Sequence, residues 1–262
     1  MSAEKIRIIP KLEIKNQYLI KGVRFEGLRK LGDPVKFAQK YYKEGADQIN
    51  IIDIVASLYG RDNLYETVNK ITDKVFVPIC VGGGIKNLDH IKKLLKCGAD
   101  RIIINSEALR NKDFLNQVIK TFGSQFITIS IEAKKINNEY YCMMDHGREN
   151  SNKRIKDWLS ELSKYELGEI IVSSIDQDGM QNGFDNDLAL ILDKEKKITC
   201  PKVISGGAGK NEDFCNILKN KNLQGLSAST CLHFNKVKIP DLKNSLKLNK
   251  ININNLKLTL EY

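Results

Sequence analysis

The stretch VPICVGGGIKNLDHIKKLLKCGADRIIINS, residues 77–106, shows the unit from which we predict the fold. A short apolar run turns at three consecutive glycines, and the amphipathic segment LDHIKKLLK follows at 88–96. This segment ends at the glycine of CGAD, where a helix needs a C-cap, and the apolar run RIIIN follows at 101–105. A strand, a helix and a second strand in this order predict a parallel β-sheet.

The same alternation continues along the whole chain, because eight apolar runs rich in Ile and Val are separated by amphipathic segments such as 35–44, 154–165 and 212–218. Strands that are covered on both faces have continuous apolar sequences of this kind. Eight strand–helix repeats in 262 residues predict an α/β protein with one (β/α)8 TIM barrel, which we place at 1–246, followed by a C-terminal extension at 247–262. The eight runs lie at 7–14, 48–54, 76–81, 101–105, 126–132, 169–174, 202–205 and 225–229.

Four sequence features occur twice, at separations of 119 to 124 positions. Repetition at a nearly constant offset indicates that a structural unit has been duplicated. We therefore predict two half-barrel repeats, one with strands one to four and the other with strands five to eight. The matched features are Glu13 with Glu132, Asp53 with Asp176, Gly82 with Gly206, and Asn105 and Ser106 with Ser229 and Thr230.

Composition and charge argue against several classes of protein. The net charge is +10, but the 42 basic residues are scattered and form no block with interleaved aromatics, so we expect no nucleic-acid partner. The six cysteines form no CxxC pair and no cluster with histidine, so we expect neither a disulfide framework nor a metal site. We also expect no cofactor. No apolar run approaches the roughly 18 residues of a membrane span, and the first residues lack the apolar stretch of a signal peptide. We expect a cytoplasmic protein without membrane association.

Glycine-rich turns recur at the C-terminal ends of the predicted strands, the end where (β/α)8 barrels assemble their active sites. Backbone N–H groups in such turns and at the following helix start favour an anion. Because the turns occur once in each half, we predict two phosphate sites across the barrel mouth and a phosphorylated small-molecule substrate. The first site consists of Gly82, Gly83, Gly84, Asn105 and Ser106, and the second of Asp178, Gly179, Gly206, Gly207, Ser229 and Thr230.

Glu13 and Glu132 project from opposite strands between these two sites, which is the layout for a general acid and a general base acting on one substrate. The alternative is that each glutamate forms a structural ion pair with Lys15, Lys21 or Lys134. We expect Lys21 to lie in the loop after the first strand, where it would fold over a phosphate. Three histidines have no partner at catalytic or metal spacing and receive no role, namely His90, His146 and His233.

Nearly the whole chain, from about residue 7 to residue 246, resembles the cyclase subunit of imidazole glycerol phosphate synthase. The segments that carry the resemblance include IIPKLEIKNQYLIKG, VPICVGGGIKNLDHIKKLLKCGADRIIINS, FGSQFITISIEAK, GEIIVSSIDQDGMQNGFD and VISGGAGKNEDF. The resemblance implies a barrel that receives ammonia from a glutaminase subunit in a heterodimer. The ammonia crosses the barrel core, attacks a ribulosyl formimino-carboxamide ribotide, and the products are imidazole glycerol phosphate and aminoimidazole carboxamide ribotide.

The resemblance also assigns residues. Lys21, Asp53 and Ser173 match substrate-contacting positions, and Asp100 matches an aspartate at the glutaminase interface. A ring of charges that gates the ammonia path falls on Arg7, Gln48, Arg101 and Glu169.

Three positions and one segment depart from the family pattern. Gln48 stands where a carboxylate is expected, and Glu13 and Glu132 replace two catalytic aspartates, which moves both carboxyl groups outward by one methylene. The segment MDHGRENSNKR also replaces a glycine-rich substrate loop.

Because both catalytic positions differ, we favour a paralogue that delivers ammonia to a separate sugar amidotransferase in surface-polysaccharide or flagellin glycan biosynthesis. SIDQDGMQNGFDN resembles that branch. The alternatives are the authentic cyclase of histidine biosynthesis and a barrel that only binds a phosphorylated ligand.

Overall fold

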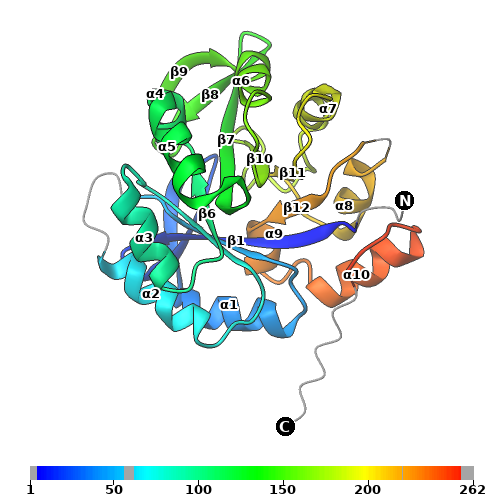
Figure 1. Cartoon of the computed structure of the whole chain (residues 1–262). Helices are drawn as coiled ribbons and strands as arrows, with labels where there is room; N and C mark the ends of the chain where they lie inside the picture. Colours follow the sequence, from blue (N-terminus) through cyan, green and yellow to red (C-terminus); the bar gives the residue numbers. More distant parts are fainter. Residues whose placement is uncertain (1–4, 56–61, 220, 255–262) are drawn as a thin grey trace.

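The computed structural model describes residues 5–55, 62–219 and 221–254 and shows the closed barrel that the sequence predicts (Figure 1). In this described part, eight parallel strands follow one another around the barrel, and β1 closes it by pairing with β4 on one side and β12 on the other. The barrel strands are β1 (Arg7–Lys15), β4 (Ile49–Asp53), β5 (Ile79–Gly82), β6 (Arg101–Ile104), β7 (Ile127–Ile136), β10 (Glu169–Ser174), β11 (Lys202–Ser205) and β12 (Gly225–Ala228).

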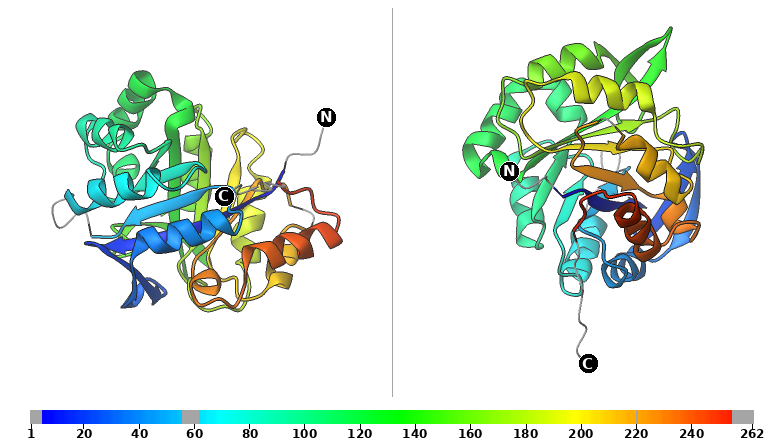
Figure 2. Two further views of the ribbon diagram at one scale, coloured as in Figure 1. Left: turned by 90° about the horizontal axis from the view of Figure 1, so that it is seen from below. Right: turned by 90° about the vertical axis from the view of Figure 1, so that its right-hand side faces the viewer.

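Helices surround the strands on the outside, as the two further views in Figure 2 show. Helix α3 spans Leu88–Lys96, as predicted, because Asn87 caps its first turn by accepting a hydrogen bond from the His90 N–H at 2.9 Å, while Ile91 and Leu94 are buried. The other helices are α1 (Pro34–Lys43), α2 (Asp62–Thr72), α4 (Ser106–Arg110), α5 (Lys112–Phe122), α6 (Ile155–Leu162), α7 (Asn186–Lys194), α8 (Asn211–Ile217), α9 (Thr230–His233), α10 (Ile239–Leu248) and the short 3₁₀ helix Ser124–Phe126.

Two β-hairpins lie at the barrel mouth where the sequence predicted loops. The first consists of β2 (Tyr18–Val23) and β3 (Glu26–Gly32), and the second of β8 (Glu139–Met144) and β9 (Glu149–Arg154). The expectation that Lys21 lies in a loop after the first strand is therefore wrong, because Lys21 lies on β2, which pairs antiparallel with β1. The pairing gives the extension of β1 a partner for its backbone groups beyond the barrel wall.

The two hairpins follow the duplication that the sequence repeat predicts. Each follows the first strand of its half, β1 or β7, and each half has a short helix directly after its last strand, α4 or α9. The registers also correspond, because Glu13 pairs with Ile20 of β2, and Glu132 pairs with Met143 of β8. In Figure 1 the first half, coloured blue to green, lies beside the second half, coloured green to red.

The C-terminal part of the described chain packs against the start of the barrel. Helix α10 continues to Leu248, so the boundary that we predicted between 246 and 247 falls inside this helix. Ile253 is buried and forms a parallel bridge with Ile6, so residues up to 254 extend the barrel's packing. Residues 255–262 of the predicted extension lie outside the described residues.

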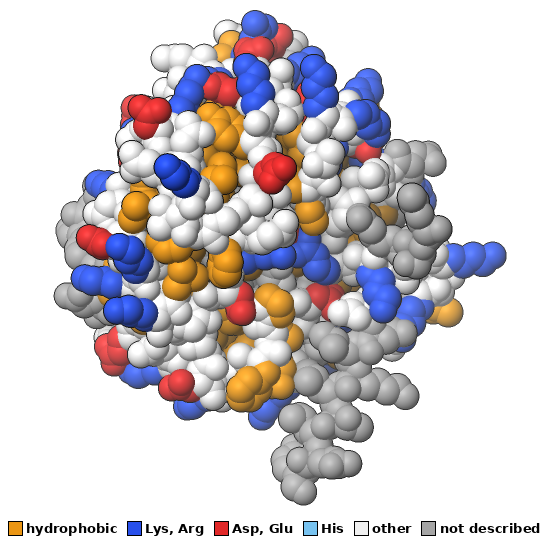
Figure 3. Space-filling view, in the orientation of Figure 1, with side chains coloured by type: hydrophobic (Ala, Val, Ile, Leu, Met, Phe, Trp, Pro, Cys, Tyr) orange, Lys and Arg blue, Asp and Glu red, His pale blue; other side chains and the backbone are white. Residues whose placement is uncertain are grey.

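Charged side chains on the face shown in Figure 3 are dispersed, with Lys and Arg distributed among acidic and uncharged residues. On this face, the pattern agrees with the scattered basic residues of the sequence. Among the described residues, no helix has both the length and the apolar character needed to cross a membrane.

Candidate active site

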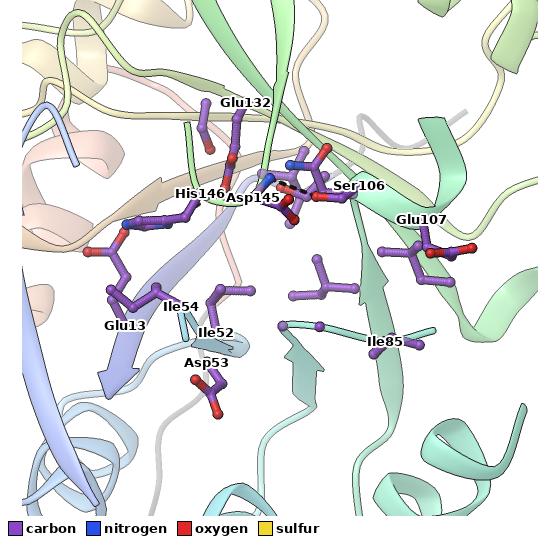
Figure 4. Close-up of a pocket in the computed structure, with 18 of the residues that line it drawn as sticks. Glu13, Ile52, Asp53, Ile54, Ile85, Ser106, Glu107, Glu132, Asp145 and His146 are labelled. Atoms are coloured by element: carbon purple, nitrogen blue, oxygen red, sulfur yellow. Dashed lines mark hydrogen bonds and ion pairs between the residues drawn. The ribbon is translucent and has the colours of Figure 1, made fainter. Parts of the chain in front are cut away.

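A pocket of about 940 Å³ opens at the C-terminal ends of the barrel strands (Figure 4). It brings together both glutamates and most of the residues predicted for the first phosphate site. Gly82 is an exception, because it is buried in β5 and packs against Ile103, where an added Cβ would lie 2.7 Å from the Ile103 carbonyl oxygen. The predicted residues that line the pocket are Glu13, Asp53, Gly83, Gly84, Asn105, Ser106, Glu132 and Ser173.

A smaller pocket of about 260 Å³ lies on the other side of the mouth and contains every residue predicted for the second phosphate site. The two glycine-rich turns that the sequence pairs therefore form two separate concavities. Those residues are Asp178, Gly179, Gly206, Gly207, Ser229 and Thr230.

Each turn has at least one glycine that the backbone requires. Gly83 has φ of 110°, and an added Cβ would lie 2.1 Å from the carbonyl oxygen of Asp53. Gly207 has φ of 107°, and its Cβ would lie 2.1 Å from the carbonyl oxygen of Gly183. Because L-residues avoid this φ and the Cβ has no room, only glycine fits these two positions.

The hydroxyl groups of the two sites differ in their partners. At the first site, Ser106 Oγ accepts a hydrogen bond from the Asp145 N–H at 2.8 Å, and Asn105 Nδ2 donates to the Met143 carbonyl at 3.2 Å, so both residues hold the β8–β9 hairpin. At the second site, the buried Thr230 Oγ1 has no hydrogen-bond partner in the described part of the chain. Buried hydroxyl groups are normally paired, so Thr230 Oγ1 is available to an anion in the smaller pocket.

Glu13 is the centre of a buried ion-pair cluster. Its two carboxylate oxygens each accept a hydrogen bond at 2.7 Å, one from Lys11 Nζ and the other from Lys21 Nζ. Lys21 Nζ also lies 2.8 Å from Asp178, and Lys11 Nζ lies 3.8 Å from the same carboxylate. The structural ion pair with Lys21 is thus present, whereas Lys15 and Lys134 are exposed. Asp178 reaches the second pocket, as predicted, with its carboxylate bonded to these lysines.

The two glutamates have opposite protonation tendencies. Burial disfavours ionisation of Glu13, but attraction to Lys11 and then Lys21 outweighs it and holds the Glu13 pKa well below the usual value. Burial raises the pKa of Glu132 to about 7, although Lys11 and a hydrogen bond from the Gly147 N–H at 3.0 Å oppose this rise. At neutral pH the site therefore offers an ionised carboxylate and a carboxyl group near its midpoint.

The difference between the two halves explains this contrast. In the matched registers, Lys11 of β1 corresponds to Ser130 of β7, and Lys21 of β2 corresponds to Met144 of β8. The first glutamate therefore has two buried cations beside it, and the second has neither at the equivalent positions.

Sequence reasoning missed two residues of this site. Lys11 lies two positions before Glu13 on the same strand, so the two-residue period of a strand places both on one face and was a usable signal. His146 lies on the β8–β9 turn and lines the pocket near Glu132, although nothing in its local sequence indicated this.

The residues assigned to the gate meet at the opposite end of the barrel. Glu169 is buried and forms ion pairs with Arg7 at 2.6 Å and Arg101 at 3.6 Å. Gln48 accepts a hydrogen bond from Arg7 at 2.7 Å and donates to Glu169 at 3.3 Å. The neutral amide of Gln48 thus joins the ring by hydrogen bonds on both sides. Asp100, which directly precedes Arg101 in the sequence, is exposed. Its carboxylate accepts a hydrogen bond from the Ile79 N–H at 2.8 Å.

Two carboxyl groups in one pocket and a second, smaller pocket at the C-terminal ends of the strands define a (β/α)8 barrel whose candidate site lies at the usual face of this fold. A family model described as "Histidine biosynthesis protein" matches residues 7–238.

Three relatives named imidazole glycerol phosphate synthase subunit HisF match over most of the chain. The relative from Natranaerobius thermophilus is 41% identical over 240 residues, covering 92% of this chain and 95% of the relative. The Legionella pneumophila relative is 44% identical over 210 residues, covering 80% of this chain and 98% of the relative. The relative from Campylobacter concisus is 38% identical over 252 residues, covering 94% of this chain and 97% of the relative. The chain belongs to the family of imidazole glycerol phosphate synthase subunit HisF.

Proposed function

We propose that this chain is the cyclase subunit of an imidazole glycerol phosphate synthase in histidine biosynthesis. Family membership and the names of its relatives support this activity over ammonia delivery to a sugar amidotransferase, for which the comparisons add no support. The substrate would be the ribulosyl formimino-carboxamide ribotide, which the enzyme closes with ammonia to imidazole glycerol phosphate and aminoimidazole carboxamide ribotide.

The observation that carries the proposal is that two carboxyl groups of one pocket have unequal surroundings, because two lysine Nζ groups contact Glu13 and one backbone N–H contacts Glu132. Glu132, whose pKa is about 7, acts as the general acid that protonates the departing nitrogen. Glu13, held ionised by Lys11 and Lys21, acts as the general base that removes a proton during ring closure. One site can therefore hold a donor and an acceptor at the same pH.

The two glycine-rich pockets would hold the two phosphate groups of this substrate. Gly83 and Gly84 of the larger pocket and Gly207 with Thr230 of the smaller pocket present backbone and hydroxyl groups. Lys11 and Glu13 line the larger pocket, and Asp178 lines the smaller one, so the ion-pair cluster separates the two. The reacting part of a substrate that spans both pockets would lie beside Glu13.

We propose that the ammonia comes from a glutaminase subunit docked at the end of the barrel that carries Arg7, Gln48, Arg101 and Glu169. These four residues lie at the N-terminal ends of the strands, opposite the two glutamates. The exposed Asp100 would belong to the same interface.

The direct test supplies the purified chain with an ammonium salt and the ribulosyl substrate, so that no glutaminase is needed. We expect turnover, and we expect Glu13→Gln and Glu132→Gln each to lower kcat by about 100-fold or more because each removes a proton-transfer group. Glu66→Gln, at an exposed ion pair with Lys70, is the matched control and should leave kcat unchanged. Absence of turnover in a folded wild-type chain would refute the proposal.

One observation supports the ammonia-delivery function as a second candidate. Both carboxylate oxygens of Glu13 are already bonded to lysine Nζ groups at 2.7 Å, which restrains the proton acceptor. Under this function the same assay would show no cyclase turnover, and the Glu→Gln variants would behave like wild type. The glutaminase would still be activated by the barrel, and the ammonia would pass to a sugar amidotransferase.

A further inference from the structure

His146 is a polar residue of the pocket, with a largely buried side chain, to which neither the sequence nor the proposed mechanism gives a role. It lies on the four-residue turn between β8 and β9, residues 145–148, where Asp145 and His146 both have left-handed backbones with φ of 49° and 59°. Its side chain is only 6% exposed, and its Nε2 has no hydrogen-bond partner in the described residues. A buried imidazole without a partner in a pocket of titratable groups suggests a task in that pocket.

The imidazole lies between the two glutamates. Its Nδ1 is 3.8 Å from Glu132 Oε1, which is longer than a direct hydrogen bond and short enough to tighten when substrate binds. Glu13 interacts electrostatically with the ring from the other side, because each residue shifts the pKa of the other. Figure 4 shows His146 between the two carboxyl groups.

The orientation of the ring is fixed from the other half of the barrel. Phe25, on the turn between β2 and β3, stacks on His146 with 4.3 Å between the ring centroids and 9° between the planes. The next residue, Gly147, donates its N–H to the other oxygen of Glu132 at 3.0 Å. The same turn thus places a backbone donor on one oxygen of Glu132 and an imidazole nitrogen near the other.

The imidazole is neutral at physiological pH. Burial lowers the His146 pKa to about 4, and although Glu13 attracts a proton to the ring, nearby cations oppose it. A neutral imidazole has one N–H donor and one acceptor nitrogen, so it can donate to Glu132 without adding a charge to the site. The charged and titratable groups around the ring are Glu13, Lys11, Lys21, Arg148, Glu132 and Asp145.

We propose that His146 is a positioning residue for Glu132, donating from Nδ1–H to Glu132 Oε1 while Gly147 holds Oε2, so that the carboxyl group faces the substrate. This role rests on the proposed cyclase function. Donation to the carboxylate favours its ionised form, so His146 also limits how far burial raises the affinity of Glu132 for its proton. The first and second hairpins act together here, because Phe25 holds the ring that holds Glu132.

The test compares His146→Phe, which keeps a ring to stack on Phe25 but has no nitrogen, with His146→Asn, whose amide N–H can replace the Nδ1 donor. We expect His146→Phe to lower kcat by roughly 10-fold or more with KM changed less than twofold. We expect the high-pH limb of the kcat profile to move up by about one pH unit, because Glu132 loses a donor to its ionised form. His146→Asn should recover most of both effects.

Two further measurements keep the result decisive. His90→Phe makes the same chemical change on α3, outside the pocket, and should change neither kcat nor the pH profile. The Glu132 carboxyl pKa, followed by 13C NMR, should rise in His146→Phe and return in His146→Asn. This readout needs no turnover, so it tests His146 even if the chain proves not to be a cyclase. An unchanged Glu132 pKa in a folded His146→Phe variant, or equal behaviour of Phe and Asn, would overturn the inference.

Discussion

At Glu132, burial raises the carboxyl pKa to about 7, whereas at Glu13 two lysine contacts at 2.7 Å reverse the effect of burial. The same type of side chain therefore has two protonation states in one pocket. The cause lies in the neighbours, because Lys11 and Lys21 lie beside one glutamate and uncharged residues lie at the equivalent positions beside the other. The proposed assignment of Glu132 as the acid and Glu13 as the base rests on these contacts.

The raised pKa of Glu132 has a consequence for stability. Its folded pKa of about 7 exceeds the unfolded value of about 4.3, so its contribution is fully present below pH 4 and is lost as pH rises through 7. Glu132→Gln removes this pH dependence. From pH 5 to pH 8, we expect the free energy of unfolding of wild type to fall by about 3 kcal/mol more than that of the variant. Chemical unfolding of both proteins at the two pH values measures this difference.

Glu13→Gln provides the opposite case. The pKa of Glu13 is depressed in the folded protein. The contribution of Glu13 to the free energy of unfolding is therefore present above its unfolded pKa and is lost only as pH falls through its folded pKa. The variant should be less stable than wild type at both pH values, because it leaves Lys11 and Lys21 buried without this anion. Equal pH dependence of the two variants would contradict the assigned protonation states.

At the scale of elements, the strand-end turns determine where an anion can bind, and glycine determines whether the turns can form. Gly207 has a left-handed backbone and no space for a Cβ beside the Gly183 carbonyl. We expect Gly207→Ala to lower the free energy of unfolding by at least about 2 kcal/mol, since it adds backbone strain and a steric clash. It should also abolish phosphate binding in the smaller pocket.

Gly27 is the matched control for this substitution. It also has a left-handed backbone, with φ of 61°, but nothing lies within 4 Å of an added Cβ. Gly27→Ala should therefore lower the free energy of unfolding by only about 1 kcal/mol, because it adds backbone strain without a steric clash. Thermal and urea unfolding of both variants would separate strain from clash, and equal losses would show that the clash at Gly207 relaxes.

The barrel elements could be predicted from the sequence, and the hairpins could not. Continuous apolar runs such as 48–54 have the composition of strands covered on both faces, and the structure contains β4 there. Strand β3 is largely exposed and has the sequence EGLRKLG, so it has no apolar alternation to distinguish it from a loop. Without the hairpins, the sequence also could not place Lys21 on a strand or bring Phe25 to His146.

The candidate site could also be predicted only in part from the sequence. Both glutamates and most residues of the predicted phosphate sites could be placed at the barrel mouth from the sequence, because the C-terminal ends of barrel strands lie at one face. The partners of these residues depend on side-chain contacts between distant segments, as between Lys21 and Asp178. Such contacts are fixed by packing, and no local pattern in one sequence encodes them.

At the scale of the whole molecule, a ligand that fills both pockets would join the two half-barrels. Ligand binding to the folded state alone stabilises it by RT ln(1 + [L]/Kd), which reaches about 2.7 kcal/mol at 100 times Kd. We expect a sugar bisphosphate to raise Tm by several degrees and inorganic phosphate to raise it less, at equal ionic strength.

Thr230→Val is the specific probe of this effect. It removes the unpaired buried hydroxyl of the smaller pocket and keeps the shape of the side chain. The variant should lose most of the extra stabilisation by the bisphosphate over a monophosphate, as measured by thermal shift. An undiminished difference would show that the second phosphate binds elsewhere.

The residues that differ between the copies, Lys11 against Ser130 and Lys21 against Met144, have an evolutionary consequence. A molecule with two copies of the first half would carry two permanently anionic glutamates, and one with two copies of the second half would carry two mostly neutral ones. Neither ancestor with identical halves could assign donor and acceptor to different strands. Different protonation of the two carboxyl groups therefore depends on divergence of the copies at a few positions next to the glutamates, while both copies keep an acidic side chain.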